Sequence, residues 1–125
     1  MDIERLVSEV IDAAFTVRES LSAGYLESVY KNALIYELFL RQIKAEAETA
    51  IAVHYKDIVV GEFRADIFVE NCLIIELKAV RELSAINEAQ LVNYLNATHI
   101  DTGLLINYGG PRIEIKRKYR SYKAQ

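Results

Sequence analysis

Apolar residues recur at helical spacing in the first third of the chain. Asp2 can cap the start of a helix, because its side chain can accept a hydrogen bond from an amide of the first turn. The apolar positions that follow lie three or four residues apart: Ile3, Leu6, Val7, Val10, Ala14, Val17 and Leu21. Gly24, which adopts positive φ without strain, is placed to end this helix. Residues 26–42 predict a second helix, and its apolar side chains cover most of its circumference, so we expect burial on more than one side.

The middle of the chain has the composition of β-strands. Residues 49–55 and 58–70 predict two strands joined by a turn at Lys56-Asp57, with Gly61 as a candidate bulge position. Asn71 marks a second turn. Residues 72–78 are almost wholly apolar, which is the pattern of a central strand covered on both faces.

A helix, a buried strand and an edge strand complete the predicted order. Ser84 can cap a helix over residues 84–97, and residues 102–107 predict another central strand. Gly109-Gly110-Pro111 breaks the chain before an alternating strand over 113–119. The order is therefore α-α-β-β-β-α-β-β, and it predicts an α/β fold with a mixed sheet flanked by helices on both faces.

Composition narrows the class of protein. The chain has 125 residues, of which 52% are hydrophobic, and we expect residues 1–125 to form one domain. The single cysteine, Cys72, excludes an internal disulfide framework, favours a cytoplasmic location and is expected to be buried. No apolar run approaches the ~18–20 residues that cross a membrane. One cysteine and two histidines far apart in the sequence, His54 and His99, do not match the usual zinc ligand sets.

The net charge of -3 hides a basic end. Residues 112–123 hold six of the 15 basic residues and only one of the 18 acids, Glu114, together with Tyr119 and Tyr122. Such a segment can contact phosphates and stack on bases. A solvated edge strand, protected from aggregation by its lysines, explains the same pattern and is the favoured interpretation on composition alone.

The candidate chemistry lies at the end of the apolar strand. Glu76 and Lys78 are two residues apart and therefore project from the same face. If the preceding turn pivots on Asn71, Asp66 lies opposite Glu76, with Cβ atoms about 5 Å apart. Two carboxylates so close repel one another unless a cation lies between them, and oxygen ligands suit Mg²⁺ or Mn²⁺. A surface salt bridge between Lys78 and one of the acids is the structural alternative.

Two further features can add to this site. Glu27 lies in the first turn of the second helix, where an acid is favoured by the helix dipole and where a packed helix could deliver a third carboxylate. The third helix carries a polar stripe at spacings of three and four: Asn87, Gln90, Asn93 and Tyr94. A solvated face explains the stripe, but Gln90 and Tyr94 could also position a phosphate or a water molecule.

Taken together, these motifs resemble the GxxExxY family of the PD-(D/E)XK nuclease-like superfamily. The resemblance rests on Gly-x-x-Glu-x-x-Tyr at 24–30, Arg-Ala-Asp at 64–66, Glu-Leu-Lys at 76–78 and Gln-x-x-x-Tyr at 90–94. It implies a restriction-endonuclease-like fold in which Glu27, Asp66, Glu76 and the carbonyl of Leu77 bind divalent metal. It also implies that Lys78 orients water or stabilises the phosphate, with Gln90 as an accessory catalytic residue. Ala65 replaces the proline of the nominal motif.

The resemblance implies a Mg²⁺- or Mn²⁺-dependent nuclease that acts on DNA rather than RNA. Asp66, Glu76, Lys78 and Gln90 would be the catalytic residues, and the expected substrate contacts are Tyr30, Tyr94, Arg117 and Lys118. A non-catalytic module that binds nucleic acid or protein is the alternative, since fold does not fix function. A homodimer is also expected, because the helices of so short a chain are strongly apolar.

Overall fold

The computed structural model describes residues 1–121, so Tyr122 and Lys123 of the basic segment lie outside the described residues. The elements are α1 (Ile3–Ser20), α2 (Glu27–Leu40), β1 (Ala45–Tyr55), β2 (Ile58–Val69), β3 (Leu73–Lys78), α3 (Ala85–Thr98), β4 (Thr102–Asn107) and β5 (Glu114–Tyr119). The strands form one sheet in the order β1-β2-β3-β4-β5. Among the described strands, only the β3–β4 pair is parallel, so the sheet is mixed, as the sequence predicted.

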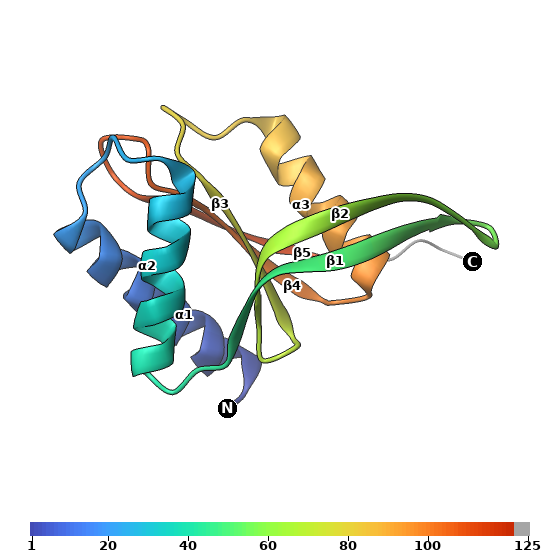
Figure 1. Cartoon of the computed structure of the whole chain (residues 1–125), viewed down its shortest axis with the longest axis horizontal. Helices are drawn as coiled ribbons and strands as arrows, with labels where there is room; N and C mark the ends of the chain where they lie inside the picture. The colour runs from blue at the N-terminus through green and yellow to red at the C-terminus, as the bar shows by residue number, and fades with distance from the viewer. Residues whose placement is uncertain (122–125) are drawn as a thin grey trace.

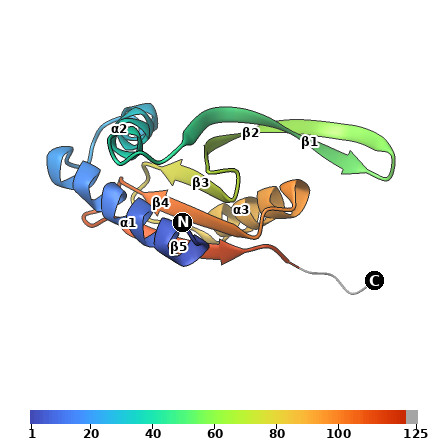
Figure 2. The ribbon, with the colours of Figure 1, turned by 90° about the horizontal axis from the view of Figure 1, so that it is seen from below.

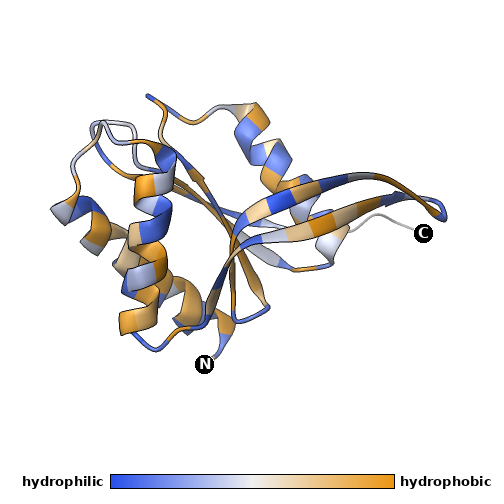
Figure 3. Ribbon diagram, in the orientation of Figure 1, coloured by the Kyte–Doolittle hydropathy of each residue, from blue (hydrophilic) through white to orange (hydrophobic). Residues whose placement is uncertain are grey.

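The sheet lies between two helical layers (Figures 1 and 2). On one face, α1 and α2 pack on the strands through a core that includes Leu6, Leu34 and Ile75. On the other face, Leu91 and Leu95 of α3 pack against Ile74 and Leu105, among others. Every residue of β4 is buried, which is the environment that its apolar sequence predicted. Figure 3 shows the same apolar character along the central strands.

The β1–β2 hairpin extends beyond the rest of the sheet as an arm (Figure 1). Its register shifts by one residue between Val53, which pairs with Gly61, and His54, which pairs with Val59. The irregularity therefore lies beside the predicted bulge position. Because the arm leaves the sheet, its inner face can pack on α3 rather than on β3, and Ile51 and Ala65 join the α3 core.

The boundaries of the elements differ from the sequence prediction at several ends. The Asp2 side chain accepts a hydrogen bond from the Arg5 amide at 2.8 Å, so the predicted start of α1 is confirmed. The helix ends at Ser20 with Leu21 as its C-cap, before the predicted end at Gly24, whose φ of 117° belongs to the turn that follows. Strand β1 begins four residues before the predicted position, because pairing between Ala45 and Val69 extends the ladder into a segment of low intrinsic β-propensity. The expectation that Cys72 is buried was wrong: it is exposed in the turn before β3. Within residues 1–121, no helix has the length and apolarity to span a bilayer.

Candidate active site

The register of β2 and β3 places two acids opposite one another. The ladder pairs Ile67 with Ile75 and Val69 with Leu73, and its continuation sets Asp66 opposite Glu76. The turn that fixes this register has positive φ at Glu70 (51°) and Asn71 (57°). Two such residues in succession are typical of a tight hairpin turn whose twist matches the flanking strands. The register therefore agrees with the predicted position of Asp66 opposite Glu76.

At this pair the regular ladder gives way to hydrogen bonds from backbone amides to the two carboxylates. The Asp66 amide donates to Glu76 Oε1 at 3.0 Å, and the Leu77 amide donates to Asp66 Oδ2 at 2.8 Å. Each carboxylate thus accepts from the backbone of the opposite strand. The two carboxylates are held at the point where the β1–β2 arm separates from β3.

The environment of Glu76 disfavours its negative charge. The side chain is 7% exposed. Burial raises the pKa of the Glu76 carboxyl to about 8, the charge of Asp66 adds to the increase, and Lys78 opposes it. The proximity of the two acids therefore favours one proton held at the pair. A divalent cation can replace that proton, so the donor set fits a hard metal ion that prefers oxygen ligands.

Lys78 lies beside the acids without pairing with either. Among residues 1–121, no nitrogen of Lys78 comes within 4.0 Å of a carboxylate oxygen, so the surface salt bridge considered as the alternative is not formed. Its charge nevertheless lowers the pKa of both Glu76 and Glu27, which places the ammonium group within electrostatic range of both. The Leu77 amide points toward Asp66, and in a strand the carbonyl of the same residue points to the same side. The Leu77 carbonyl therefore faces the acid pair.

Glu27 is close enough to interact with the pair but does not join it. It is the first residue of α2, and its side chain is exposed. Partial desolvation and the charge of Asp66 raise the pKa of the Glu27 carboxyl. Within the described part of the chain, no three His, Cys, Asp or Glu side chains are close enough to hold one metal ion together. The arrangement therefore contains a two-carboxylate centre with Glu27 nearby.

Helix α3 brings Tyr94 toward the acids and leaves Gln90 in solvent. Burial raises the pKa of the Tyr94 hydroxyl, and the charges of Glu76 and Asp66 raise it further, which places this hydroxyl near the pair. The Tyr94 ring stacks on Phe63 of β2 with centroids 3.7 Å apart. Gln90 is exposed on the same helix.

Tyr30, one of the predicted substrate contacts, lies inside the hydrophobic core. Tyr30 is completely buried and stacks on Tyr108 with centroids 4.6 Å apart, and its hydroxyl donates to the Ser22 carbonyl at 2.6 Å. It therefore stabilises the start of α2 and is not accessible to a substrate. The substrate role predicted for Tyr30 is not supported by this geometry, because the apolar packing of α2 encloses the ring.

The basic strand β5 does not present one cationic surface. Arg117 forms two hydrogen bonds of 2.8 Å with Glu4 of α1, whereas the Lys118 Nζ lies 3.0 Å from Glu88 of α3. These helices cover opposite faces of the sheet, so the two cations point to opposite sides. The expectation that both contact one substrate is not supported by this geometry, and the edge-strand interpretation agrees with it.

Asn107, which the sequence did not single out, hydrogen-bonds to the backbone that follows Lys78. Asn107 is fully buried; its Oδ1 accepts from the Val80 amide at 2.9 Å, and its Nδ2 donates to the Val80 carbonyl at 2.9 Å. The same Nδ2 donates to Glu114 at 2.8 Å. The available signal was a polar residue that ends an apolar strand, since a buried amide needs partners. Asn107 thereby positions the segment directly after the candidate site.

Comparisons with known proteins agree with this architecture. A family model described as the PD-(D/E)XK nuclease superfamily matches residues 4–118. The fold is similar to the crystal structure of SSO0001, with a TM-score of 0.59 and 19% sequence identity. The similarity covers 77% of this chain and 50% of that one, so the chain spans about half the length of SSO0001. No curated protein matches the sequence.

Proposed function

Because the chain belongs to the PD-(D/E)XK nuclease superfamily, we propose that it is a divalent-metal-dependent nuclease that hydrolyses phosphodiester bonds, in DNA rather than RNA. Within the superfamily, we propose that it is a member of the GxxExxY family, on the basis of the motif at 24–30. The observation that carries the proposal is the Asp66–Glu76 pair, in which Glu76 is buried, with Lys78 projecting from the same face of β3 as Glu76.

The proposed metal ligands are Asp66, Glu76 and the carbonyl of Leu77. Glu27 would complete the set after a local adjustment of its exposed side chain. When bound, Mg²⁺ or Mn²⁺ would supply positive charge that polarises the phosphate and lowers the pKa of water. The raised pKa of Glu76 supports this assignment. It shows that the negative charge of the carboxylate is poorly stabilised by its surroundings, and a bound cation would stabilise it.

Lys78 is proposed to act on the substrate rather than on the fold. It forms no ion pair with the described residues, so its ammonium group can donate to a water molecule or to a phosphate oxygen. Its position two residues after Glu76 sets it on the face that α3 covers. Gln90 and Tyr94 of α3 would then contact the same substrate. The Gln90 side chain is exposed to solvent, so a bound substrate could reach it.

The remaining parts of the proposal concern the setting of the domain. We propose that residues 1–125 act as one domain in the cytoplasm. We also propose a homodimer, which rests on the exposed apolar residues of α2, Tyr36, Phe39 and Leu40. Static light scattering tests the dimer, and a monomer mass at micromolar concentration would contradict it.

A nuclease assay tests the catalytic proposal. The wild-type protein is incubated with single-stranded, duplex and branched DNA and with RNA, with Mg²⁺ or Mn²⁺ and with EDTA. Lys78→Ala and Asp66→Asn should lose cleavage, whereas Lys56→Ala and Glu62→Gln, which change exposed residues of the arm, should keep it. Cleavage by Lys78→Ala at the wild-type rate would contradict the assignment. Salt-dependent binding without cleavage by any protein would instead favour a binding module.

A further inference from the structure

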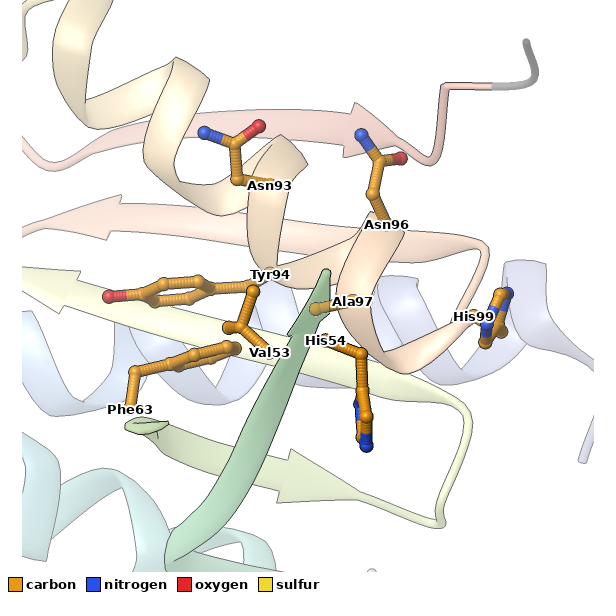
Figure 4. A pocket seen from close by; sticks show the side chains of 8 residues that line it. All are labelled: Val53, His54, Phe63, Asn93, Tyr94, Asn96, Ala97 and His99. Carbon is orange, nitrogen blue, oxygen red and sulfur yellow. The ribbon is translucent and has the colours of Figure 1, made fainter. Parts of the chain in front are cut away.

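A groove lies between α3 and the β1–β2 arm, next to the acid pair. It has a volume of about 520 Å³ and is lined by Val53, His54, Phe63, Asn93, Tyr94, Asn96, Ala97 and His99. Figure 4 shows the rings of Phe63 and Tyr94 lying face to face, with the two amides on the helix and an imidazole on each element. This volume is in the range of small-molecule sites and can hold a nucleotide.

The lining has the chemistry of nucleobase recognition. The half-buried ring of Tyr94, already flat against Phe63, offers an aromatic surface on which a base can stack. Asn93 is exposed on α3, and its amide carries both a donor and an acceptor, the combination that reads the edge of a base. In a duplex, the hydrogen-bonding edges of a base are either paired with the opposite base or accessible only through the grooves. Stacking on Tyr94 and hydrogen bonding to Asn93 therefore favour an unpaired base.

The charge of the lining fits a polyanion. None of the eight lining residues is acidic, in contrast to the neighbouring Asp66–Glu76 pair. His99 lies beside Arg120, whose Nη1 is 3.0 Å from the His99 Nδ1 and whose Nη2 is 3.0 Å from the Asp101 Oδ1. The lining itself therefore places no carboxylate against a phosphate in the groove.

The groove leads to the candidate active site. Phe63 and Asp66 are three residues apart on β2, a separation of roughly 10 Å along a strand. Tyr94 lies between the groove and the acid pair. Its ring stacks on Phe63, and its hydroxyl is close enough to Glu76 and Asp66 for their charges to raise its pKa. Adjacent nucleotides of one strand can span this separation.

We propose that the groove between α3 and the β1–β2 arm binds an unpaired nucleotide, with its base stacked at Tyr94 and read by Asn93, and so presents the neighbouring phosphate to Asp66 and Glu76. The inference rests on the proposed nuclease function and adds the substrate class, a single-stranded segment. It assigns Tyr94 and Asn93 as specificity residues that do not take part in bond cleavage.

Binding in EDTA tests the groove separately from catalysis. Fluorescence anisotropy measures the affinity of the full chain for a labelled single-stranded oligonucleotide and for the matching duplex. Asn93→Asp should weaken single-strand binding about tenfold, the effect of losing one base contact. Asn32→Asp is the matched control, because it makes the same charge change at an exposed asparagine of α2, and it should change the affinity less than twofold.

Photo-crosslinking locates the bound base directly. A single-stranded oligonucleotide that contains 5-iodouracil is irradiated with the wild-type protein in EDTA, and the linked peptide is identified by mass spectrometry. We expect the crosslink at Tyr94 or Phe63. The inference is overturned if the wild-type protein does not bind the single strand, if it binds duplex more tightly, if both asparagine variants bind equally, or if the crosslink maps outside the groove.

The outcomes separate this inference from the nuclease proposal. Equal binding by Asn93→Asp and wild type, with cleavage that still depends on Lys78, would reject the groove and keep the nuclease. Single-strand binding that is sensitive to Asn93→Asp, without metal-dependent cleavage, would keep the groove and reject the nuclease.

Discussion

Asp66 and Glu76 hold one another through the backbone: the Asp66 amide donates to Glu76 Oε1 at 3.0 Å, and Asp66 Oδ2 accepts from the Leu77 amide at 2.8 Å. The positions of both carboxylates therefore depend on the register of β2 and β3. A one-residue slip would move Asp66 to the other face of the sheet and separate the pair. The tight turn at Glu70-Asn71 is consequently part of what builds the site.

The first prediction concerns the dependence of stability on pH. The pKa of Glu76 in the folded protein is raised to about 8 from an ordinary value of 4.5, so the folded state holds this proton more strongly than the unfolded chain. Without metal, the free energy of unfolding should fall as pH rises from about 4.5 to about 8, by an amount on the order of a few kcal/mol. Urea unfolding across this range measures the slope.

Two glutamine variants control this experiment. Glu76→Gln should remove most of the slope, because the buried group no longer titrates. Glu62→Gln, an exposed acid on the β2 side of the arm, should keep the wild-type slope. An unchanged slope in Glu76→Gln would show that other groups cause the pH dependence.

The second prediction concerns metal binding. Mg²⁺ should raise the melting temperature of the wild-type protein more at pH 8 than at pH 6, because the metal competes with the proton held at Glu76. Asp66→Asn should lose the increase, since one of the two carboxylates is gone, while its amide oxygen can still accept from Leu77. Differential scanning fluorimetry measures both. A Mg²⁺ shift in Asp66→Asn as large as in the wild type would argue against this site.

The third prediction ranks the carboxylates. Because Glu27 is exposed and is not within a metal-holding group in the structure, Glu27→Gln should keep a larger part of the Mg²⁺-induced increase in melting temperature than Asp66→Asn does. Isothermal titration with Mn²⁺ gives the affinities directly. Equal losses in the two variants would mean that α2 carries a full metal ligand.

The fourth prediction compares two glycines. A Cβ at Gly109 would lie 2.4 Å from backbone atoms of Ala79 and Val80, directly after Lys78, so Gly109→Ala must displace that segment. It should lower the free energy of unfolding by about 1–3 kcal/mol and reduce cleavage as well. A Cβ at Gly61 meets nothing within 4 Å, and Gly61→Ala should stay within about 0.5 kcal/mol of wild type. Chemical denaturation measures both, and equal effects would refute the packing argument.

The fold and the acid pair were predictable because they depend on short-range information. Hydrophobic periodicity gave the element order, and strand alternation with a turn at Asn71 gave the pairing of Asp66 with Glu76. The ends of β1 were not predictable in the same way. Ala45 joins the strand because Val69 lies opposite it, and local propensity does not contain that partner.

What lies around the pair was decided by packing between distant elements. The sequence by itself determined the helices and strands, their order and the face shared by Glu76 and Lys78, since each follows from spacing along one segment. Only the tertiary structure decided that Tyr30 is enclosed against Tyr108, that Arg117 and Lys118 pair with helices on opposite faces, and that Phe63 meets Tyr94 across a groove. These outcomes depend on how each helix is positioned over the sheet. The helices take the positions that bury the most apolar surface of the whole chain, and the sequence of one segment does not contain that information.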